Sequence, residues 1–300
     1  MYQPKPLYKL LDWIDINKLD WNILSKNPNA IRLLEANPDK IYWLYLSTNP
    51  NAIPLLEANP EKINWDGLTQ NPNGLHLLKP NLYKLHKGAL DCLALNPNAI
   101  PLLEKNPGLI YWNWLSENPN AIPLLEQNLN KISWTGVSTN PSAIPLLEAN
   151  PDKINWNWLS YNPSAIPLLE ANPNKINWNF LSANPSAIPL LEQNPDKIVW
   201  KSLSENPNYI PLLEANPDKV DWKRLSGNPN AIPLLEKNQD KIHWKELSEN
   251  PSIFEMDYKT MKKQMVDIYK EELIQKAFHP SRIQKYLDMG ISIDELDNCI

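Results

Sequence analysis

Residues that could do chemistry are few and scattered in this 300-residue chain. The only cysteines, Cys92 and Cys299, lie far apart, which excludes a disulfide scaffold and a zinc site built on cysteines. Four histidines leave little material for a metal cluster, and the sequence lacks GxGxxG, P-loop, HExxH and GxSxG motifs. The histidines are His76, His86, His243 and His279.

A series of glutamates could supply carboxylates for acid–base chemistry, but it recurs at one position of a repeat. It includes Glu35, Glu57, Glu104, Glu126 and Glu148. A catalytic carboxylate needs a partner and an environment of its own, whereas these residues all share the same one. We interpret the series as a solvated face and predict a protein that is not an enzyme, with no catalytic residue, no metal and no cofactor.

The composition favours a folded protein that does not coat nucleic acid. Apolar residues make up 42% and charged residues 21%, with 29 basic against 34 acidic side chains and a formal net charge of −5. Such a balance suits phosphate backbones poorly. We see no signal peptide in residues 1–6 and no apolar run of the roughly 18 residues that a membrane span needs. We therefore expect a soluble protein, inside a cell or in a virus particle, with no membrane partner.

The elements that hold these residues form a repeat with a period of 22. Asn-Pro occurs 18 times, and one series of 11 sites is spaced by 22 residues except between Asn71 and Asn96, which are 25 apart. A Trp lies six residues before each site except Asn96, where Leu90 takes its place. Such a period indicates a solenoid. The Trp ladder comprises Trp21, Trp43, Trp65, Trp112, Trp134, Trp156, Trp178, Trp200, Trp222 and Trp244.

Each repeat has two halves that open on Asn-Pro. In the half at Asn37, Asn is a preferred N-cap and Pro38 suits the first helical position, so we expect a helix from Pro38 to about Ser47. In the other half, Pro54 follows Pro50 by four residues and would interrupt a helix begun at Pro50. We expect a turn or 3₁₀ segment there, followed by a short helix from Pro54.

The apolar positions recur in every repeat and can be buried only by stacking. We predict an all-α fold, an α-solenoid (superhelix) of alternating short α- and 3₁₀-helices with Trp in a continuous core. The repeats would make a curved rod of about 100 Å. Residues 1–26 are predicted as a degenerate first repeat or cap, and residues 27–251 as the solenoid, with a 25-residue unit at 71–95. Residues 252–300 are predicted as a helical cap or docking segment.

After the last repeat, two further helices are predicted. The first, residues 257–278, ends at His279-Pro280, and the second, residues 281–289, stops at Gly290. Ser292 and Glu295 have the spacing of a capping box for a last turn. The apolar stripe of the first helix is Tyr258, Met261, Met265 and Ile268.

The phrase LSxNPNAIPLLEANPDKI resembles the leucine-rich repeat variant family over roughly residues 7–251. In that family, alternating α- and 3₁₀-helices stack into a right-handed superhelix, so the resemblance implies the same architecture. This sequence departs from it in its shorter period and its Trp. A closer likeness is to the Trp- and Asn-Pro-rich repeat proteins of large nucleocytoplasmic DNA viruses of the marseillevirus and mimivirus type. AFHPSRIQKYLDMG, residues 277–290, resembles tails of proteins from such viruses. The likeness implies a viral origin but no activity.

Positions that vary between repeats could serve recognition, and the two residues after each Trp vary most. Aromatic side chains there, and one before an Asn-Pro, could form a contact strip. The alternative is packing, since Tyr45 lies four residues after Ile41 and shares its helix face. A basic stripe nearer the C-terminus, diluted by Glu205, Glu246 and Glu249, is a solvated face or a site for an acidic partner. The partner-binding candidates are Tyr45, Trp114, Trp158, Tyr161 and Phe180, and the stripe is Lys201, Lys223, Arg224 and Lys245.

Two functions fit this organisation. The leading hypothesis is an interaction scaffold that binds a protein or peptide, viral or host, through an extended surface without making or breaking a bond. The alternative is a structural or packaged component of a large DNA virus particle. The sequence leaves open which partner binds, which face is used and how many chains associate.

Overall fold

The computed structural model describes residues 6–277 and 279–290, and most of these residues are helical. The chain divides into two compact units, one of residues 10–254 and one that contains residues 6–9 together with the described residues from 255 onward. The first unit holds the repeats. The predicted helical repeat is confirmed in the regular order of its elements.

Most repeats contain a helix that begins at Ile, a 3₁₀ turn that begins at Pro, and a helix that begins at Trp. The Ile-led row is α2 Ile31–Glu35, α4 Ile53–Glu57, α6 Leu75–Leu78, α8 Ile100–Lys105, α10 Ile122–Glu126, α12 Ile144–Glu148, α14 Ile166–Glu170, α16 Ile188–Gln193, α18 Ile210–Ala215 and α20 Ile232–Glu236. The Trp-led row is α1 Trp21–Leu24, α3 Trp43–Thr48, α5 Trp65–Leu68, α7 Lys87–Cys92, α9 Trp112–Leu115, α11 Trp134–Thr139, α13 Trp156–Leu159, α15 Trp178–Ala183, α17 Trp200–Leu203, α19 Trp222–Ser226 and α21 Trp244–Glu249.

The 3₁₀ turns connect the two rows of helices. Those that lead into the Trp-led row are η1 Ile16–Lys18, η2 Pro38–Lys40, η3 Pro60–Lys62, η4 Lys79–Lys84, η6 Pro107–Leu109, η8 Pro151–Lys153, η9 Pro173–Lys175, η10 Pro195–Lys197, η11 Pro217–Lys219 and η13 Gln239–Lys241. The others are η5 Leu93–Leu95, η7 Pro119–Ala121, η12 Pro229–Ala231 and η14 Pro251–Ile253. The extra residues of the 25-residue repeat extend η4.

The helix predicted from Pro38 to Ser47 is wrong, because the chain leaves the helical conformation between η2 and α3. Tyr42 is extended, and its N–H donates to the Ser25 hydroxyl of the preceding repeat (3.0 Å). The predicted cap at Asn37 is also wrong. Its side chain makes no cap bond to η2 and instead donates to the Leu33 carbonyl at the end of α2 (2.9 Å). The hydrogen bond from Tyr42 to Ser25 and the one from Asn37 to Leu33 replace the hydrogen bonds that a continuous helix would form here.

The core is built from Leu, Ala, Ser and Asn rather than from Trp. Leu46, Ser47, Asn49 and Ala52 show the pattern, and each is fully buried. The ladder Trp side chains are only half-buried, so the prediction of a Trp core is wrong. The small Ser and Ala side chains in this pattern let neighbouring repeats approach closely enough to exchange hydrogen bonds.

The Asn that opens each repeat makes the same buried hydrogen bonds to the repeat before it. The Asn49 amide donates to the carbonyls of Ser25 (3.1 Å) and Asn27 (2.8 Å). Its side-chain oxygen accepts the N–H of Asn51, which fixes the local turn. The pattern recurs at Asn71, Asn96, Asn118, Asn140, Asn162, Asn184, Asn206, Asn228 and Asn250. Buried amides and carbonyls are thus paired from repeat to repeat.

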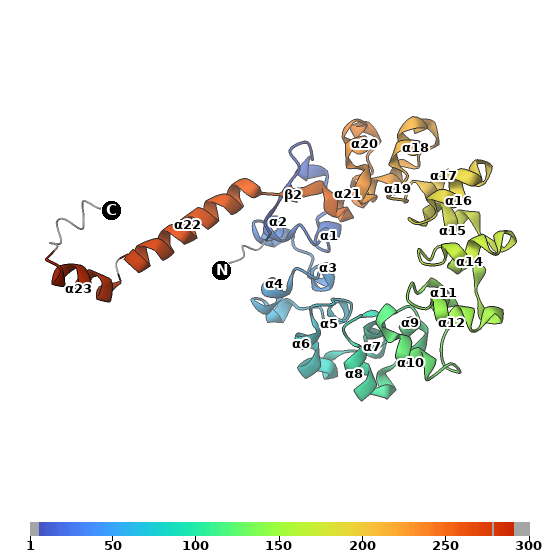
Figure 1. Cartoon of the computed structure of the whole chain (residues 1–300), viewed down its shortest axis with the longest axis horizontal. Helices are drawn as coiled ribbons and strands as arrows, with labels where there is room; N and C mark the ends of the chain where they lie inside the picture. Colours follow the sequence, from blue (N-terminus) through green and yellow to red (C-terminus); the bar gives the residue numbers. More distant parts are fainter. Residues whose placement is uncertain (1–5, 278, 291–300) are drawn as a thin grey trace. The chain divides into compact units, whose positions relative to one another are not determined.

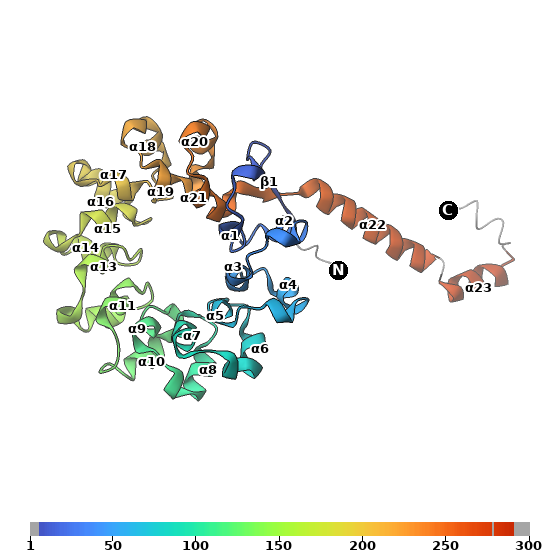
Figure 2. The same cartoon turned by 180° about the vertical axis from the view of Figure 1, so that it is seen from behind.

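The row of repeats closes on itself, so the prediction of a curved rod is wrong. The Asn27 amide donates to the carbonyls of Ser248 (3.2 Å) and Asn250 (3.0 Å), and the N–H of Asp20 donates to the Ser248 hydroxyl (2.9 Å). The same Asn amide bonds join every two neighbouring repeats, and the N–H to hydroxyl bond recurs at most joints; here both are made between the first and the last repeat. Figures 1 and 2 show residues 10–254 as a ring with the Trp-led helices along its inner rim and the Ile-led helices outside. We call this unit the ring.

Two short strands add a small sheet to the helical fold. β1 (Tyr8–Leu10) pairs with β2 (Phe254–Met256), so the all-α prediction misses one element. The N–H of Leu11 donates to the Ile253 carbonyl (2.9 Å) and that of Asp257 to the Leu7 carbonyl (2.8 Å). The residue numbers rise along one strand as they fall along the other, so the two strands are antiparallel.

Two helices follow the sheet. α22 is Tyr258–Ala277 and α23 is Pro280–Asp288, close to the predicted bounds. Gly290 has a positive φ of 82°, as expected of a helix stop. The predicted apolar stripe is half-buried beyond its first residue, while Val266 and Leu273 on other parts of α22 are more exposed. The proposed capping box at Ser292 and Glu295 lies outside the described residues.

Candidate functional site

The half-buried Trp side chains are covered by lysines of the next repeat. Lys40 Nζ lies 4.4 Å from the centre of the Trp21 indole, and Lys219 Nζ lies 4.5 Å from that of Trp200. The same cation–π pairing closes the ring, since Lys18 lies over Trp244 (5.0 Å). The other pairs are Lys62 with Trp43, Lys84 with Trp65, Lys131 with Trp112, Lys175 with Trp156, Lys197 with Trp178 and Lys241 with Trp222.

Two positions depart from this pairing. Where Leu90 replaces the Trp, the residue 19 positions later is Leu109 instead of Lys. At this joint, Leu90 and Leu109 thus replace both the Trp and the Lys of the other repeats. Lys153, which by spacing would cover Trp134, instead pairs with the adjacent Asp152 (3.0 Å). The Trp ladder thus belongs to the joints between repeats and leaves recognition to other residues.

The aromatic candidates fall into two groups by exposure. Tyr45, Trp114 and Phe180 are half-buried, and each makes an aromatic contact. Tyr45 packs edge-on against Tyr42 (centroids 5.0 Å apart), and Trp114 packs against Tyr111 (5.9 Å). For Tyr45 and Trp114 the structure therefore supports the packing alternative.

Trp158, Tyr161 and Phe180 form a different arrangement, which we call the aromatic cluster. Trp158 is 41% exposed and Tyr161 is 47% exposed. The Trp158 indole lies 5.0 Å from the Phe180 phenyl in the next repeat at a tilt of 32°. The N–H of Tyr161 donates to the Trp158 carbonyl (3.0 Å), so Tyr161 lies in the turn that directly follows α13. The cluster combines a supported aromatic pair with two solvent-accessible aromatic side chains.

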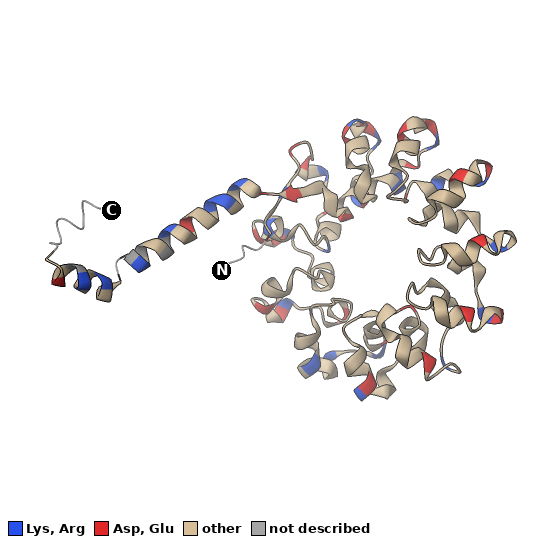
Figure 3. Cartoon of the chain, viewed as in Figure 1, with Lys and Arg blue, Asp and Glu red and all other residues tan. Residues whose placement is uncertain are grey.

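The two helices that carry Trp158 and Phe180 contain no charged residue. Helices α13 and α15 contain no Lys, Arg, Asp or Glu, and both are uncoloured in Figure 3. Amides flank the aromatic side chains instead, as Asn177 donates to Asn157 (3.0 Å) and Asn179 accepts from the Ser202 hydroxyl (2.8 Å). Such a surface favours apolar and hydrogen-bonded contacts over electrostatic attraction.

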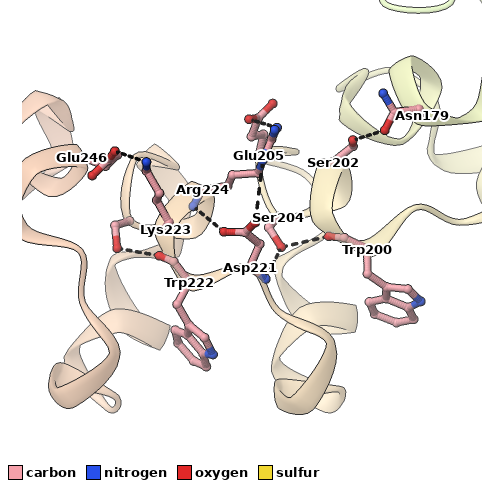
Figure 4. Close-up of polar contacts among 11 residues, drawn as sticks. Asn179, Trp200, Ser202, Ser204, Glu205, Asp221, Trp222, Lys223, Arg224 and Glu246 are labelled. Atoms are coloured by element: carbon pink, nitrogen blue, oxygen red, sulfur yellow. Dashed lines mark hydrogen bonds and ion pairs between the residues drawn. The ribbon is translucent and has the colours of Figure 1, made fainter.

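The basic stripe is largely neutralised. Arg224 pairs with Glu205 and also faces Asp221 (3.8 Å), while Lys223 faces Glu246 (3.5 Å). Figure 4 shows these ion pairs on one side of α17 and α19, with the ladder side chains Trp200 and Trp222 pointing away from them. Lys201 and Lys245 are exposed and have no ion pair among the described residues. These acidic partners cancel most of the positive charge that would attract an anionic ligand. The stripe is therefore better explained as a solvated face.

No catalytic or metal-binding constellation is found in the part of the chain that the structure describes. Within it, no group of three His, Cys, Asp or Glu side chains could hold a metal ion. Burial, followed by the charges of Asp91 and Asp66, raises the pKa of the Cys92 thiol, which opposes a reactive thiolate. His76 pairs with Glu57 (2.8 Å) and His86 with Asp66 (2.7 Å), both across neighbouring repeats. None of the described helices has the length and hydropathy to span a membrane.

Sequence reasoning missed two features. It did not connect the lysine that recurs 19 residues after each ladder Trp with the indole, although this constant spacing signals their contact. It also passed over Tyr209, which interrupts a row of small buried residues. Aligning the repeats with one another would have found it.

Comparisons with protein-family models, curated proteins and solved structures found no match. The predicted resemblance to viral repeat proteins therefore stays a prediction, as does the location of the protein in an infected cell or a virus particle. The possible role as a particle component likewise rests on the sequence alone.

Proposed function

We propose that this protein is a non-enzymatic scaffold: an α-solenoid closed into a ring that binds a protein or peptide through the aromatic cluster. The observation that carries the proposal is the exposure of Trp158 and Tyr161 on a frame whose neighbouring repeats are joined by buried hydrogen bonds. Trp and Tyr supply large contact areas at interfaces and are the residue types that most often dominate binding energy. Apolar area exposed beside amides also matches the mixed character of interface cores.

The ring favours this function because the cluster is held in place before a partner arrives. Asn162 and Asn184 fix the two repeats that carry the cluster, with Asn184 donating to the Asn162 carbonyl at 2.9 Å. A rigid frame reduces the entropy lost on binding, so that more of the contact energy contributes to affinity. The absence of charge on α13 and α15 favours a partner segment with apolar or aromatic anchors over a strongly charged one.

The test is a peptide selection against the purified full chain, followed by measurement of dissociation constants by fluorescence polarisation. We expect selected peptides to carry an aromatic or aliphatic anchor. Trp158→Ala and Tyr161→Ala should each weaken binding by about tenfold or more, which is the usual loss at an interface hot spot. Tyr83→Ala is the matched control, because Tyr83 is 80% exposed and lies outside the cluster.

Circular dichroism must show that the variants keep the helical content of the parent chain. Selected peptides that bind Trp158→Ala and Tyr161→Ala as tightly as the parent would contradict the proposal. Equal loss in Tyr83→Ala would also contradict it, because binding would then follow general surface hydrophobicity instead of the cluster.

A further inference from the structure

Tyr209 breaks a row of small buried residues. The residue before each Ile-led helix is buried between neighbouring repeats and is Ala in most of them. Tyr209 occupies this position before α18 and is only 7% exposed, so its large side chain is inserted where the other repeats have a methyl group or less. The small residues of the row are Ala30, Ala52, Gly74, Ala99, Ala121, Ala143, Ala165, Ala187 and Ala231.

The larger side chain alters its surroundings. Tyr209 has φ −116° and ψ 20°, against −84° and 3° at Ala187 in the preceding repeat. The first hydrogen bond of the helix lengthens accordingly, from 3.0 Å for Leu191 N to the Ala187 carbonyl to 3.3 Å for Leu213 N to the Tyr209 carbonyl. A cavity of about 690 Å³ lies between α16 and α18, and Tyr209 forms part of its wall.

The walls of this cavity are mainly apolar. Ile188 of α16, Leu212 of α18 and Ile198 line it and are partly exposed, whereas Leu191 behind them is fully buried. Cavities of several hundred Å³ with apolar walls and a few polar groups are the usual form of small-ligand sites. The volume here is sufficient for a ligand of one aromatic group with a short chain.

Of the two charged side chains at the cavity, Lys219 has an interaction partner and Glu192 has no cationic one among the described residues. Lys219 lies over the Trp200 indole, like the other lysines of its row. Glu192 has no cationic partner among the described residues. The equivalent Glu214 in the next repeat pairs with Lys237 (2.7 Å), which lies 23 residues later, whereas the residue 23 positions after Glu192 is Ala215. Glu192 is therefore an unpaired carboxylate at the edge of an apolar cavity.

We propose that the cavity between α16 and α18 binds an aromatic or aliphatic amine, with the apolar body against Ile188 and Leu212 and the ammonium group at Glu192. The Tyr209 hydroxyl, which has no hydrogen-bond partner in the described part of the chain, offers a second polar contact. Burial, followed by the charge of the Glu192 carboxylate, raises the pKa of this phenol, so the hydroxyl remains protonated. This site is separate from the aromatic cluster and does not depend on the proposed scaffold function.

Three probes of nearly equal size test the proposal on the full chain by ligand-observed NMR titration: 2-phenylethylamine, 2-phenylethanol and 3-phenylpropionate. Ligands of this size bind with dissociation constants of about a millimolar. We expect the amine to bind about threefold more tightly than the alcohol, and the acid to bind most weakly, because a partly exposed ion pair contributes modestly.

Two variants separate the roles of the residues. Tyr209→Ala restores the residue found in most repeats, so it should fold and should lose binding of all three probes as the two helices close together. Glu192→Gln should keep the affinity for the alcohol and lose the preference for the amine. Glu214→Gln is the matched control, because its carboxylate is already paired with Lys237, and it should change none of the affinities.

Tighter binding of the acid than of the amine would overturn the proposal, because Lys219 would then be the recognition group. So would binding that survives Tyr209→Ala in a folded protein, or the absence of saturable binding up to about 20 mM of any probe, beyond the range expected of ligands of this size.

Discussion

Replacing Asn27 with Ala tests the closure of the ring through its energetic cost. The Asn27 side chain is 1% exposed and makes three hydrogen bonds. Its amide donates to the carbonyls of Ser248 and Asn250, and its oxygen accepts the N–H of Asn29. The two amide bonds exist only if the first repeat contacts the last.

The matched variant is Asn118→Ala, in the middle of the row. Asn118 is also 1% exposed, donates to the carbonyls of Ala94 (2.9 Å) and Asn96 (3.1 Å), and accepts from Asn120. At about 0.5–1.5 kcal/mol for each bond, with buried carbonyls left unpaired, each variant should lower the free energy of unfolding by about 2–4 kcal/mol.

Urea denaturation followed by circular dichroism measures both costs, at one protein concentration and with the slopes compared. The closed ring predicts equal losses for Asn27→Ala and Asn118→Ala. If the row were open, the Asn27 amide would face water and only its local turn bond would matter, at about 0.5–1 kcal/mol. A loss of that size at Asn27, beside the full loss at Asn118, would refute closure.

Three further predictions concern the joints between repeats. Leu90→Trp combined with Leu109→Lys should rebuild the missing cation–π pair, and a double-mutant cycle should give a favourable coupling of about 0.5–1 kcal/mol; zero coupling would mean that Lys and Trp are not in contact. Gly67→Ala should destabilise by about 1–3 kcal/mol, since its Cβ would lie 2.7 Å from the Leu44 carbonyl oxygen, whereas an unchanged melting temperature would show that the repeats are looser. Burial raises the pKa of Glu117, so the folded state disfavours its charged form. Glu117→Gln should therefore raise the urea midpoint near pH 7 but not near pH 3, below the usual glutamate pKa of about 4.3, and an equal gain at both pH values would exclude a charge effect.

Much of the ring can be predicted from the sequence because its information is local. Each Asn-Pro starts a turn, and each Pro after Ile fixes the start of a helix, as at Pro54, where α4 begins one residue earlier than predicted. The break at Tyr42 could not be predicted in this way. It depends on a hydrogen bond to Ser25, 17 residues earlier, and propensity reports only on neighbours along the chain.

Closure is also beyond local reasoning. It follows from a small rotation between successive repeats, added over the whole row, and no single repeat encodes the sum. The residue two positions after the Trp differs between joints: a Cβ at Gly67 would lie 2.7 Å from the Leu44 carbonyl oxygen, while Phe180 lies beside the Trp158 indole. The exposure of the candidate residues also depends on contacts that the position within a repeat does not determine. Tyr45 and Trp158 occupy equivalent positions, yet Tyr45 packs against Tyr42 while Trp158 remains 41% exposed.

Zero-length carbodiimide cross-linking tests the closed ring most directly. Lys26 Nζ lies 2.6 Å from Glu249 Oε1 across the joint between the first and last repeats, and Lys237 Nζ lies 2.7 Å from Glu214 Oε1 within the row. Peptide mass spectrometry of the monomer band should find both isopeptide links in the same chain. Recovery of the Lys237–Glu214 link without the Lys26–Glu249 link, or of the latter only in dimers, would contradict a ring closed within one chain.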